Sequence, residues 1–235
     1  MSAETSRRAP LVLITGYGRG IGRAVALELA RRSVELALFG RSSPAATETL
    51  RYLSELGATV RAYDVELSSP ESIEHGIDAL LEAQGVPDAV INNAATIERL
   101  PLEEMTLESW DRQQAVNLRA PFLVVRGLLA AMRRRGSGRF VQVGSIASTL
   151  GTARASAYCA SKWGLVGFTK SLAEELTCSG LSAVAVLPGS VDTEMLSGSG
   201  FSPRMTPEEV ARTLCHYALD ASVAHNGAVV EMFGV

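Results

Sequence analysis

The sequence predicts a doubly wound α/β fold, in which helices cover both faces of a parallel sheet. Short apolar runs alternate along the chain with segments whose apolar residues recur at helical spacing. A glycine cluster stands between the first apolar run and the first helical segment. No linker, repeat or low-complexity stretch interrupts the alternation. We therefore expect a single domain over residues 11–235 that follows a flexible segment at residues 1–10.

Each element is predicted from a local pattern. The first strand, with the sequence LVLIT, is apolar, contains β-branched residues and ends at glycines. Gly40 closes the second strand, and Gly57 ends the second helix. The predicted strands are Leu11–Thr15, Val34–Phe39, Thr59–Tyr63, Ala89–Ile91, Arg139–Val143, Ser182–Leu187 and Ala228–Met232. The predicted helical regions are Gly20–Arg32, Ala45–Leu56, Pro70–Ala83, Thr106–Arg135, Ala155–Thr177 and Thr206–Leu219.

Composition excludes several classes of protein. A net charge of −3 provides no cationic field for nucleic acid, so we expect no nucleic-acid partner. Cys159, Cys178 and Cys215 lie in unrelated segments, without a CxxC or a Cys/His pair at ligand spacing. This usage predicts reduced thiols, no metal site and a cytoplasmic location. No apolar run approaches the roughly 20 residues that span a bilayer, so we expect no membrane association.

The glycine loop after the first strand has the features of a phosphate site. It reads Gly16-Tyr17-Gly18-Arg19-Gly20-Ile21-Gly22. Gly16 can adopt the angles of a tight turn, Gly20 lets the chain approach a pyrophosphate, and Gly22 lets the helix pack closely on the sheet. The helix N-terminus then presents unpaired N–H groups to the phosphates. A plain strand-to-helix turn, the alternative, needs one glycine rather than four.

The residues after the second strand distinguish between the nicotinamide cofactors. Dinucleotide-binding folds place an acid near this position when they accept the ribose 2′-hydroxyl of NAD. Here Gly40-Arg41-Ser42 follows the strand, with no acid in the stretch. Arg19 adds a second guanidinium on the same side, and two arginines can clamp a dianionic phosphate. We therefore expect NADP(H) rather than NAD(H), with Arg19, Arg41 and Ser42 at the 2′-phosphate. Two solvated surface arginines are the alternative.

The glycine spacing after Thr15, Gly-x3-Gly-x-Gly, resembles that of the short-chain dehydrogenase/reductase family in its single-domain form. Further motifs similar to the family's follow in order to about Thr193. The resemblance implies additional cofactor contacts beyond the ends of the third, fourth and sixth strands. These are Asp64 and Val65, then Asn92 and Ala94, and finally Pro188, Gly189, Val191 and Thr193.

Tyr158 and Lys162 form a Tyr-x3-Lys pair on one predicted helix. Residues four apart share a helix face, so the phenol and the ammonium point into the same space. A neighbouring ammonium favours phenolate and lowers the phenol pKa from its usual value near 10 toward a range that suits acid–base catalysis. Ser145 directly follows the fifth strand, at the strand ends that line the ligand crevice of such sheets.

The resemblance assigns roles to these residues and adds Asn117 to the set. Ser145 and Tyr158 donate hydrogen bonds to a substrate carbonyl oxygen, and Tyr158 supplies the proton as the nicotinamide delivers hydride. Lys162 lowers the pKa of Tyr158 and holds the nicotinamide ribose. Asn117 positions a water that links Lys162 to solvent. An asparagine that satisfies a backbone group inside a helix is the alternative for Asn117.

The substrate side is less well defined. The nearest subgroup is that of 3-oxoacyl-carrier-protein reductases and related ketoreductases, but the segment at residues 194–205 is a short Gly/Ser-rich lid. Such a lid predicts mobility and an open site for a small carbonyl substrate or a carrier-tethered one; a trimmed loop without function is the alternative. Glu174-Glu175 would repel an acidic carrier.

Three functions remain open at this point. We expect an NADPH-dependent ketone reductase. NADP-dependent oxidation of a secondary alcohol uses the same residues, and a non-catalytic cofactor-binding scaffold or sensor is a third possibility. The family resemblance also implies a homodimer or homotetramer, built through the two long helices and the C-terminal strand.

Overall fold

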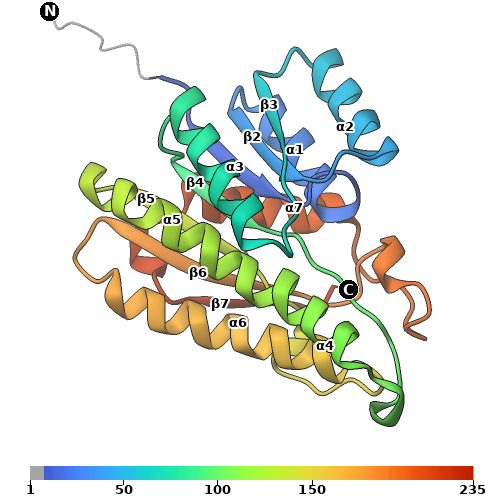
Figure 1. Cartoon of the computed structure of the whole chain (residues 1–235). Helices are drawn as coiled ribbons and strands as arrows, with labels where there is room; N and C mark the ends of the chain where they lie inside the picture. The colour runs from blue at the N-terminus through green and yellow to red at the C-terminus, as the bar shows by residue number, and fades with distance from the viewer. Residues whose placement is uncertain (1–7, 235) are drawn as a thin grey trace, which may run out of the picture.

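Seven strands form one parallel sheet in the order β3-β2-β1-β4-β5-β6-β7 (Figure 1). The structure is a computed structural model, and it describes residues 8–234. The strands are β1 (Leu11–Thr15), β2 (Glu35–Gly40), β3 (Val60–Asp64), β4 (Ala89–Asn92), β5 (Gly138–Val143), β6 (Leu181–Pro188) and β7 (Val229–Met232). The predicted doubly wound fold is confirmed.

Helices cover both faces of this sheet. They are α1 (Gly20–Arg31), α2 (Pro44–Glu55), α3 (Pro70–Ala83), α4 (Leu107–Gln114), α5 (Ala120–Arg135), α6 (Ser156–Glu175) and α7 (Pro207–Cys215). Single turns η1 (Leu102–Glu104), η3 (Ile146–Ser148), η4 (Glu194–Leu196) and η6 (Val223–His225) lie between them, and π-helical turns η2 (Ala115–Arg119) and η5 (His216–Asp220) continue α4 and α7.

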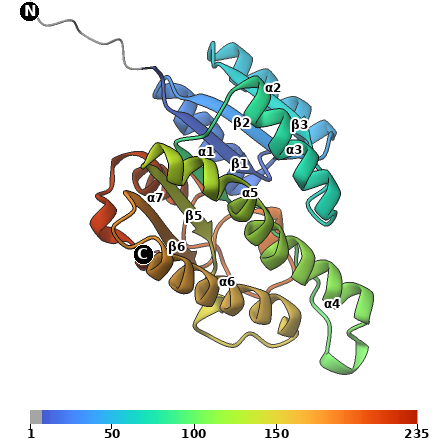
Figure 2. The same cartoon turned by 60° about the vertical axis from the view of Figure 1, so that its left-hand side comes forward.

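Two hydrophobic cores result, one on each face of the sheet. Alternate strand residues point to opposite faces. In β1, for example, Val12 and Ile14 pack with α1, α2 and α7, whereas Leu11 and Leu13 pack with α3, α5 and α6. In both views α5 and α6 run side by side over the second face (Figures 1 and 2).

Local sequence signals explain where most helices begin. Ser43, Ser69, Thr106 and Thr206 accept a backbone N–H at the starts of α2, α3, α4 and α7, which satisfies one of the amides that a helix start leaves unpaired. At the start of α1, the N-cap Arg19 makes no such bond. The first turn of α1 therefore keeps its amides available.

The helical stretch Leu107–Arg135 combines α4, η2 and α5. Its length and an apolar window of mean hydropathy 1.4 would allow it to cross a membrane, but 56% of that window is buried within the fold. Helices of this kind also form the cores of sheet-based domains, and α5 packs against α3 here.

The chain reverses its direction of winding at β1, which lies between β2 and β4. In open α/β sheets, ligands bind beyond the carboxyl ends of the strands at this reversal. The expected flexible segment at residues 1–10 lies largely outside the described residues. Of its described part, Arg8 forms an ion pair with Asp88 at 3.2 Å.

Candidate active site

A cleft of about 2520 Å³ runs along the carboxyl ends of the strands. Sites for single small molecules usually measure about 300–1,000 Å³, so this cleft has room for a dinucleotide together with a substrate. Most of the predicted site residues line it. They are Gly16, Gly18, Arg19, Gly20, Ile21, Gly22, Arg41, Ser42, Val65, Ala94, Ser145, Tyr158, Lys162, Pro188, Gly189, Val191 and Thr193. Asp64, Asn92 and Asn117 do not line the cleft.

The glycine loop is held by the end of β4. The Thr15 hydroxyl accepts the N–H groups of Asn93 and Ala94, each at 3.1 Å. In return, the Asn93 side chain donates to the carbonyl oxygens of Thr15 at 3.1 Å and Gly16 at 3.0 Å. A Cβ on Gly22 would lie 2.1 Å from the Gly16 carbonyl oxygen. Only glycine therefore permits this approach of α1 to the loop.

These features fit the phosphates of a dinucleotide. The uncapped first turn of α1 directs unpaired N–H groups toward the loop, and helix N-termini bind anions through such groups. Gly20 has a φ of 55°, in the left-handed region that glycine adopts without strain. Residues 16–22 can therefore hold a pyrophosphate by backbone contacts.

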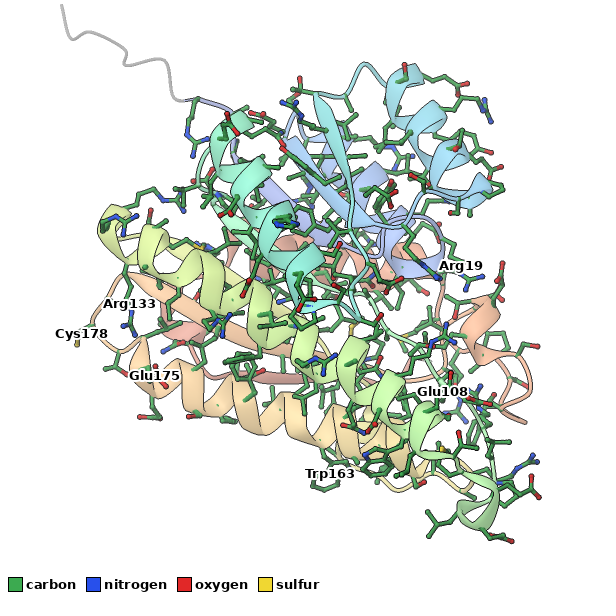
Figure 3. The ribbon with its side chains drawn as sticks, in the orientation of Figure 1. Arg19, Glu108, Arg133, Trp163, Glu175 and Cys178 are labelled. Atoms are coloured by element: carbon green, nitrogen blue, oxygen red, sulfur yellow. The ribbon has the colours of Figure 1, made fainter. Side chains whose placement is uncertain are left out.

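Both arginines expected at the 2′-phosphate line the cleft, and each has an acidic partner. Arg19 forms an ion pair with Glu194 of the lid, toward which it extends in Figure 3. The Nε atom of Arg41 lies 3.7 Å from Oε2 of Glu66. Asp64 accepts the backbone N–H of Ser42 at 3.0 Å. The stretch after β2 contains no acid, but the end of β3 and the segment after it bring two acids to this stretch, Asp64 and Glu66.

Ser145 follows β5 and begins the turn η3. Its hydroxyl oxygen accepts the N–H of Ala147 at 3.1 Å, and the Ser148 hydroxyl accepts the N–H of Ser145 at 3.3 Å. These bonds fix the Ser145 side chain and leave its hydroxyl proton available for donation.

Tyr158 and Lys162 share one face of α6, as their spacing predicts. The Lys162 Nζ atom lies 5.7 Å from the centre of the Tyr158 ring and donates to the Val143 carbonyl at 2.7 Å. Both side chains are buried.

The expected lowering of the Tyr158 pKa is not found. Burial raises the pKa of Tyr158, and the Ser145 side chain and the positive charge of Arg99 oppose this rise. Burial also lowers the pKa of Lys162 to about 7. The expectation considered the neighbouring charge and neglected the cost of desolvation, which acts on both groups. Near neutral pH the phenol is therefore protonated.

Asn117 makes the backbone contacts that were its alternative role in the sequence-based prediction, and its water contact stays a prediction. It is fully buried in η2. Its side chain accepts the N–H of Thr96 at 2.8 Å and donates to the Thr96 carbonyl at 2.9 Å and to the Ser161 hydroxyl at 3.1 Å. Ser161 in turn donates to the Tyr158 carbonyl at 2.7 Å. Both donors are used, so Asn117 joins the β4 loop to α6 and leaves one lone pair for a water.

Asn92 is the last residue of β4, and its side chain turns into the core. It lies beside Gln142 in the strand register. Neither side chain has a hydrogen-bond partner among residues 8–234. Because side chains alternate along a strand, the next residue, Asn93, lines the cleft instead.

Three cleft residues were missed by the sequence reasoning. Glu66 and Glu194 pair with the predicted arginines. Arg99 holds the lid by donating to the carbonyl oxygens of Met195 at 3.0 Å and Ser197 at 3.3 Å. Their sequence signals were weak, since only the fold brings residues 99 and 195 together. No group of three or more His, Cys, Asp and Glu residues that could hold a metal gathers within residues 8–234.

Replacement of the buried lysine should make stability less dependent on pH. The Lys162 pKa is about 7 when folded, against 10.5 for an ordinary lysine, so between these values the unfolded chain binds the extra proton. Wild-type stability therefore rises with pH across this window. In cofactor-free urea unfolding, we expect Lys162→Met to be about 3 kcal/mol more stable than wild type near pH 7 and nearly equal to it near pH 10.

Lys170→Met is the matched control, since exposed Lys170 also donates to a backbone carbonyl, that of Gly227 at 2.7 Å. It should gain no stability at either pH. An equal effect of both substitutions would contradict a desolvated Lys162.

Comparison with known proteins agrees with this geometry. The family model described as "short chain dehydrogenase" matches residues 10–200. A 3-oxoacyl-[acyl-carrier-protein] reductase of Synechocystis sp. is 30% identical over 231 residues, covering 94% of each chain. An NADPH-dependent pterin aldehyde reductase of Arabidopsis thaliana is 32% identical over 232 residues, covering 96% of this chain and 94% of the relative.

Solved structures agree as well. Levodione reductase superposes with a TM-score of 0.89 at 29% identity. A variant of actinorhodin polyketide ketoreductase with NADPH superposes with a TM-score of 0.90 at 28% identity, and each match covers 96% of both chains. This chain therefore belongs to the short-chain dehydrogenase family and is an NAD(P)-dependent oxidoreductase.

Proposed function

We propose that this chain reduces the carbonyl group of a ketone to a secondary alcohol with NADPH. The observation that carries the proposal is the placement of the buried Tyr158 phenol in the same cleft as the Ser145 hydroxyl and the glycine loop, where burial raises its pKa. The names of the relatives support it, since they describe reductases of 3-oxoacyl, aldehyde and polyketide carbonyl groups, and two of the names include NADPH.

The two hydroxyl groups would act on the carbonyl oxygen. The Ser145 hydroxyl and the neutral Tyr158 phenol can each donate a hydrogen bond to an oxygen on which negative charge develops. The bound NADPH supplies the hydride to the carbonyl carbon. Tyr158 then transfers its proton to the oxygen, as a general acid.

Lys162 and Asn117 would support Tyr158 in different ways. With a pKa of about 7, Lys162 can exchange a proton near neutral pH, and we propose that it also binds the nicotinamide ribose. Asn117 acts as a positioning residue, because its bonds to Thr96 and Ser161 fix the helix turn that carries Tyr158. A relay water would have to use the remaining lone pair of Oδ1.

The preference for NADPH over NADH would come from Arg19 and Arg41. Both guanidinium groups are largely exposed in the cleft, where they can exchange their carboxylate partners for a phosphate dianion. Asp64 is occupied by the Ser42 amide, which makes it less available for a ribose hydroxyl. The other contacts of the cofactor come from the residues of the cleft walls named above.

The raised pKa of Tyr158 suits reduction, the direction in which the phenol donates a proton, and alcohol oxidation, in which Tyr158 accepts one, stays the alternative. The presence of all four predicted catalytic residues argues against a non-catalytic scaffold. For a carrier-tethered substrate, Arg133 offsets part of the acidic surface through its ion pair with Glu175 at 3.9 Å (Figure 3). We propose a free carbonyl compound first and a carrier-bound one as the alternative.

We also propose a homo-oligomer and a cytoplasmic location. Trp163 projects from α6 with 53% of its surface exposed (Figure 3), and Phe122 on the adjacent α5 is 41% exposed. Exposed aromatic side chains on neighbouring helices suit an interface with a second copy. All three cysteines are free, as expected in a reducing compartment.

Removal of the Tyr158 hydroxyl should abolish proton donation. We expect Tyr158→Phe to lower kcat for an accepted ketone by about 10²- to 10⁴-fold, while NADPH binding, followed by cofactor fluorescence, stays within about twofold. Tyr217→Phe, which lies outside the cleft lining, should behave as wild type. Near-normal turnover by Tyr158→Phe would remove the basis of the mechanism.

Removal of the Arg41 charge should selectively weaken NADPH binding. Charge-assisted hydrogen bonds to a phosphate are each worth about 1.5–3 kcal/mol, so we expect Arg41→Ala to raise the Kd for NADPH about 10- to 100-fold and to leave that for NADH unchanged. Arg51→Ala, on the surface of α2, removes the same charge outside the cleft and should change neither. Equal weakening of both cofactors would contradict a 2′-phosphate contact.

A further inference from the structure

Arg99 lies in the wall of the cleft that faces the lid. It follows β4 on the loop that passes Tyr158, and it lines the cleft together with Ser145, Tyr158 and the lid residue Met195. Its positive charge acts on the Tyr158 phenol and lowers the pKa of that group against the larger effect of burial. Arg99 is therefore a cation close to the reacting end of the site.

The arginines of the cleft fall into two groups, and Arg99 belongs to the group without a carboxylate partner among the described residues, together with Arg112, Arg119 and Arg204. Among these four, Arg99 is the one whose charge acts on Tyr158. Arg19, Arg23 and Arg41 each pair with a carboxylate. Within residues 8–234, the Arg99 guanidinium instead contacts the neutral backbone carbonyls of the lid at 3.0 and 3.3 Å, and no ion pair is formed. A guanidinium has five N–H donors, so further donors and the whole charge remain available.

The acid next to Arg99 in the sequence, Glu98, forms its hydrogen bond with another residue and not with Arg99. The Glu98 carboxylate accepts the hydroxyl of Ser109 on α4 at 2.6 Å. The lining of the cleft also includes the apolar side chains of Ile97, Leu150 and Phe201, of which Ile97 is two residues from Arg99 and Phe201 belongs to the lid. A cation beside apolar walls attracts an anion more strongly than a fully hydrated cation does.

We propose that Arg99 binds an anionic group of the substrate, a carboxylate or a phosphate, and so selects carbonyl compounds that carry a negative charge. This inference rests on the proposed carbonyl reduction and narrows its substrate class to keto acids and related anions. The anion accepts the planar N–H donors of Arg99 in a bidentate pair. A short carbon chain then places the carbonyl oxygen at Ser145 and Tyr158.

The test compares ketones that differ only in charge. The acids are acetoacetate, 4-oxopentanoate and 5-oxohexanoate, and each is compared with its methyl ester in the presence of NADPH. A further ketone, 2-oxopropylphosphonate, tests whether a phosphate-like group is accepted in place of the carboxylate. We expect kcat/KM to favour the best acid over its ester by about 10- to 100-fold. The best chain length reports the separation of Arg99 from the carbonyl site, and the phosphonate shows which anion is preferred.

Variants separate charge recognition from support of the lid. Arg99→Gln should lower kcat/KM for the acid by about 10- to 100-fold and leave the ester within about threefold, and Arg99→Lys should retain part of the preference. Arg154→Gln is the matched control, since exposed Arg154 lies outside the cleft lining, although its carbonyl accepts the N–H of Leu100. It should keep the full preference.

Two results would overturn the inference. One is a wild-type enzyme that reduces acids and esters equally well. The other is an Arg99→Gln variant that loses activity on both by the same factor, which would assign Arg99 to the lid alone.

A binding measurement keeps this inference separate from the proposed function. We expect pentanoate, which cannot be reduced, to bind the NADP⁺ complex of the wild type at least about tenfold more tightly than pentanamide, and to lose this advantage in Arg99→Gln. Such binding without turnover of any ketone would refute the proposed function and support the anion site. Equal binding of acid and amide would refute the anion site.

Discussion

The link between the ends of β1 and β4 is the contact on which the rest of the site depends. The Thr15 hydroxyl and the Asn93 amide make four hydrogen bonds across this point, all between 3.0 and 3.1 Å. They join the glycine loop to the wall of the cleft that continues to Arg99. Because the sheet reverses its winding here, the two strand ends border an open crevice rather than a packed loop. A side chain on Gly16 would press against Ala94, 2.8 Å away, and would break this junction.

Burial determines the chemistry at the other wall. Tyr158 and Lys162 lie on one helix face, as the sequence predicted. Desolvation raises the pKa of Tyr158 and lowers that of Lys162, and each shift favours the neutral form of the group. The resulting neutral phenol is a proton donor, which suits carbonyl reduction. Asn117 maintains this geometry from a distance, through the hydroxyl of Ser161. The same low-polarity surroundings strengthen the effect of any charge nearby, and Arg99 is the charge that acts on the phenol.

The sequence predicted most of the fold, and most of the site residues it predicted line the cleft, for a physical reason. Apolar periodicity, the glycine loop and Tyr-x3-Lys are local patterns, and each corresponds to a local structure. Predictions that depended on side-chain direction were less successful. Asn92 turns into the core while Asn93 faces the cleft, because one residue along a strand changes the face. The partners of Arg19, Arg41 and Arg99 lie up to 175 positions away in sequence, so only the folded chain brings them together.

The pH dependence of ketone reduction tests the central claim most directly, namely that a protonated Tyr158 donates the proton. Single-turnover reduction with bound NADPH isolates this step from product release. If burial holds the phenol protonated, the rate should persist from about pH 7 to about pH 9 and fall only as the pH approaches or exceeds about 10, the usual phenol value. A rate that decreases steadily above about pH 7 in both the wild type and Lys162→Met, which lacks the lysine of pKa about 7, would mean that the phenol ionises near neutrality. That result would contradict a site in which desolvation dominates.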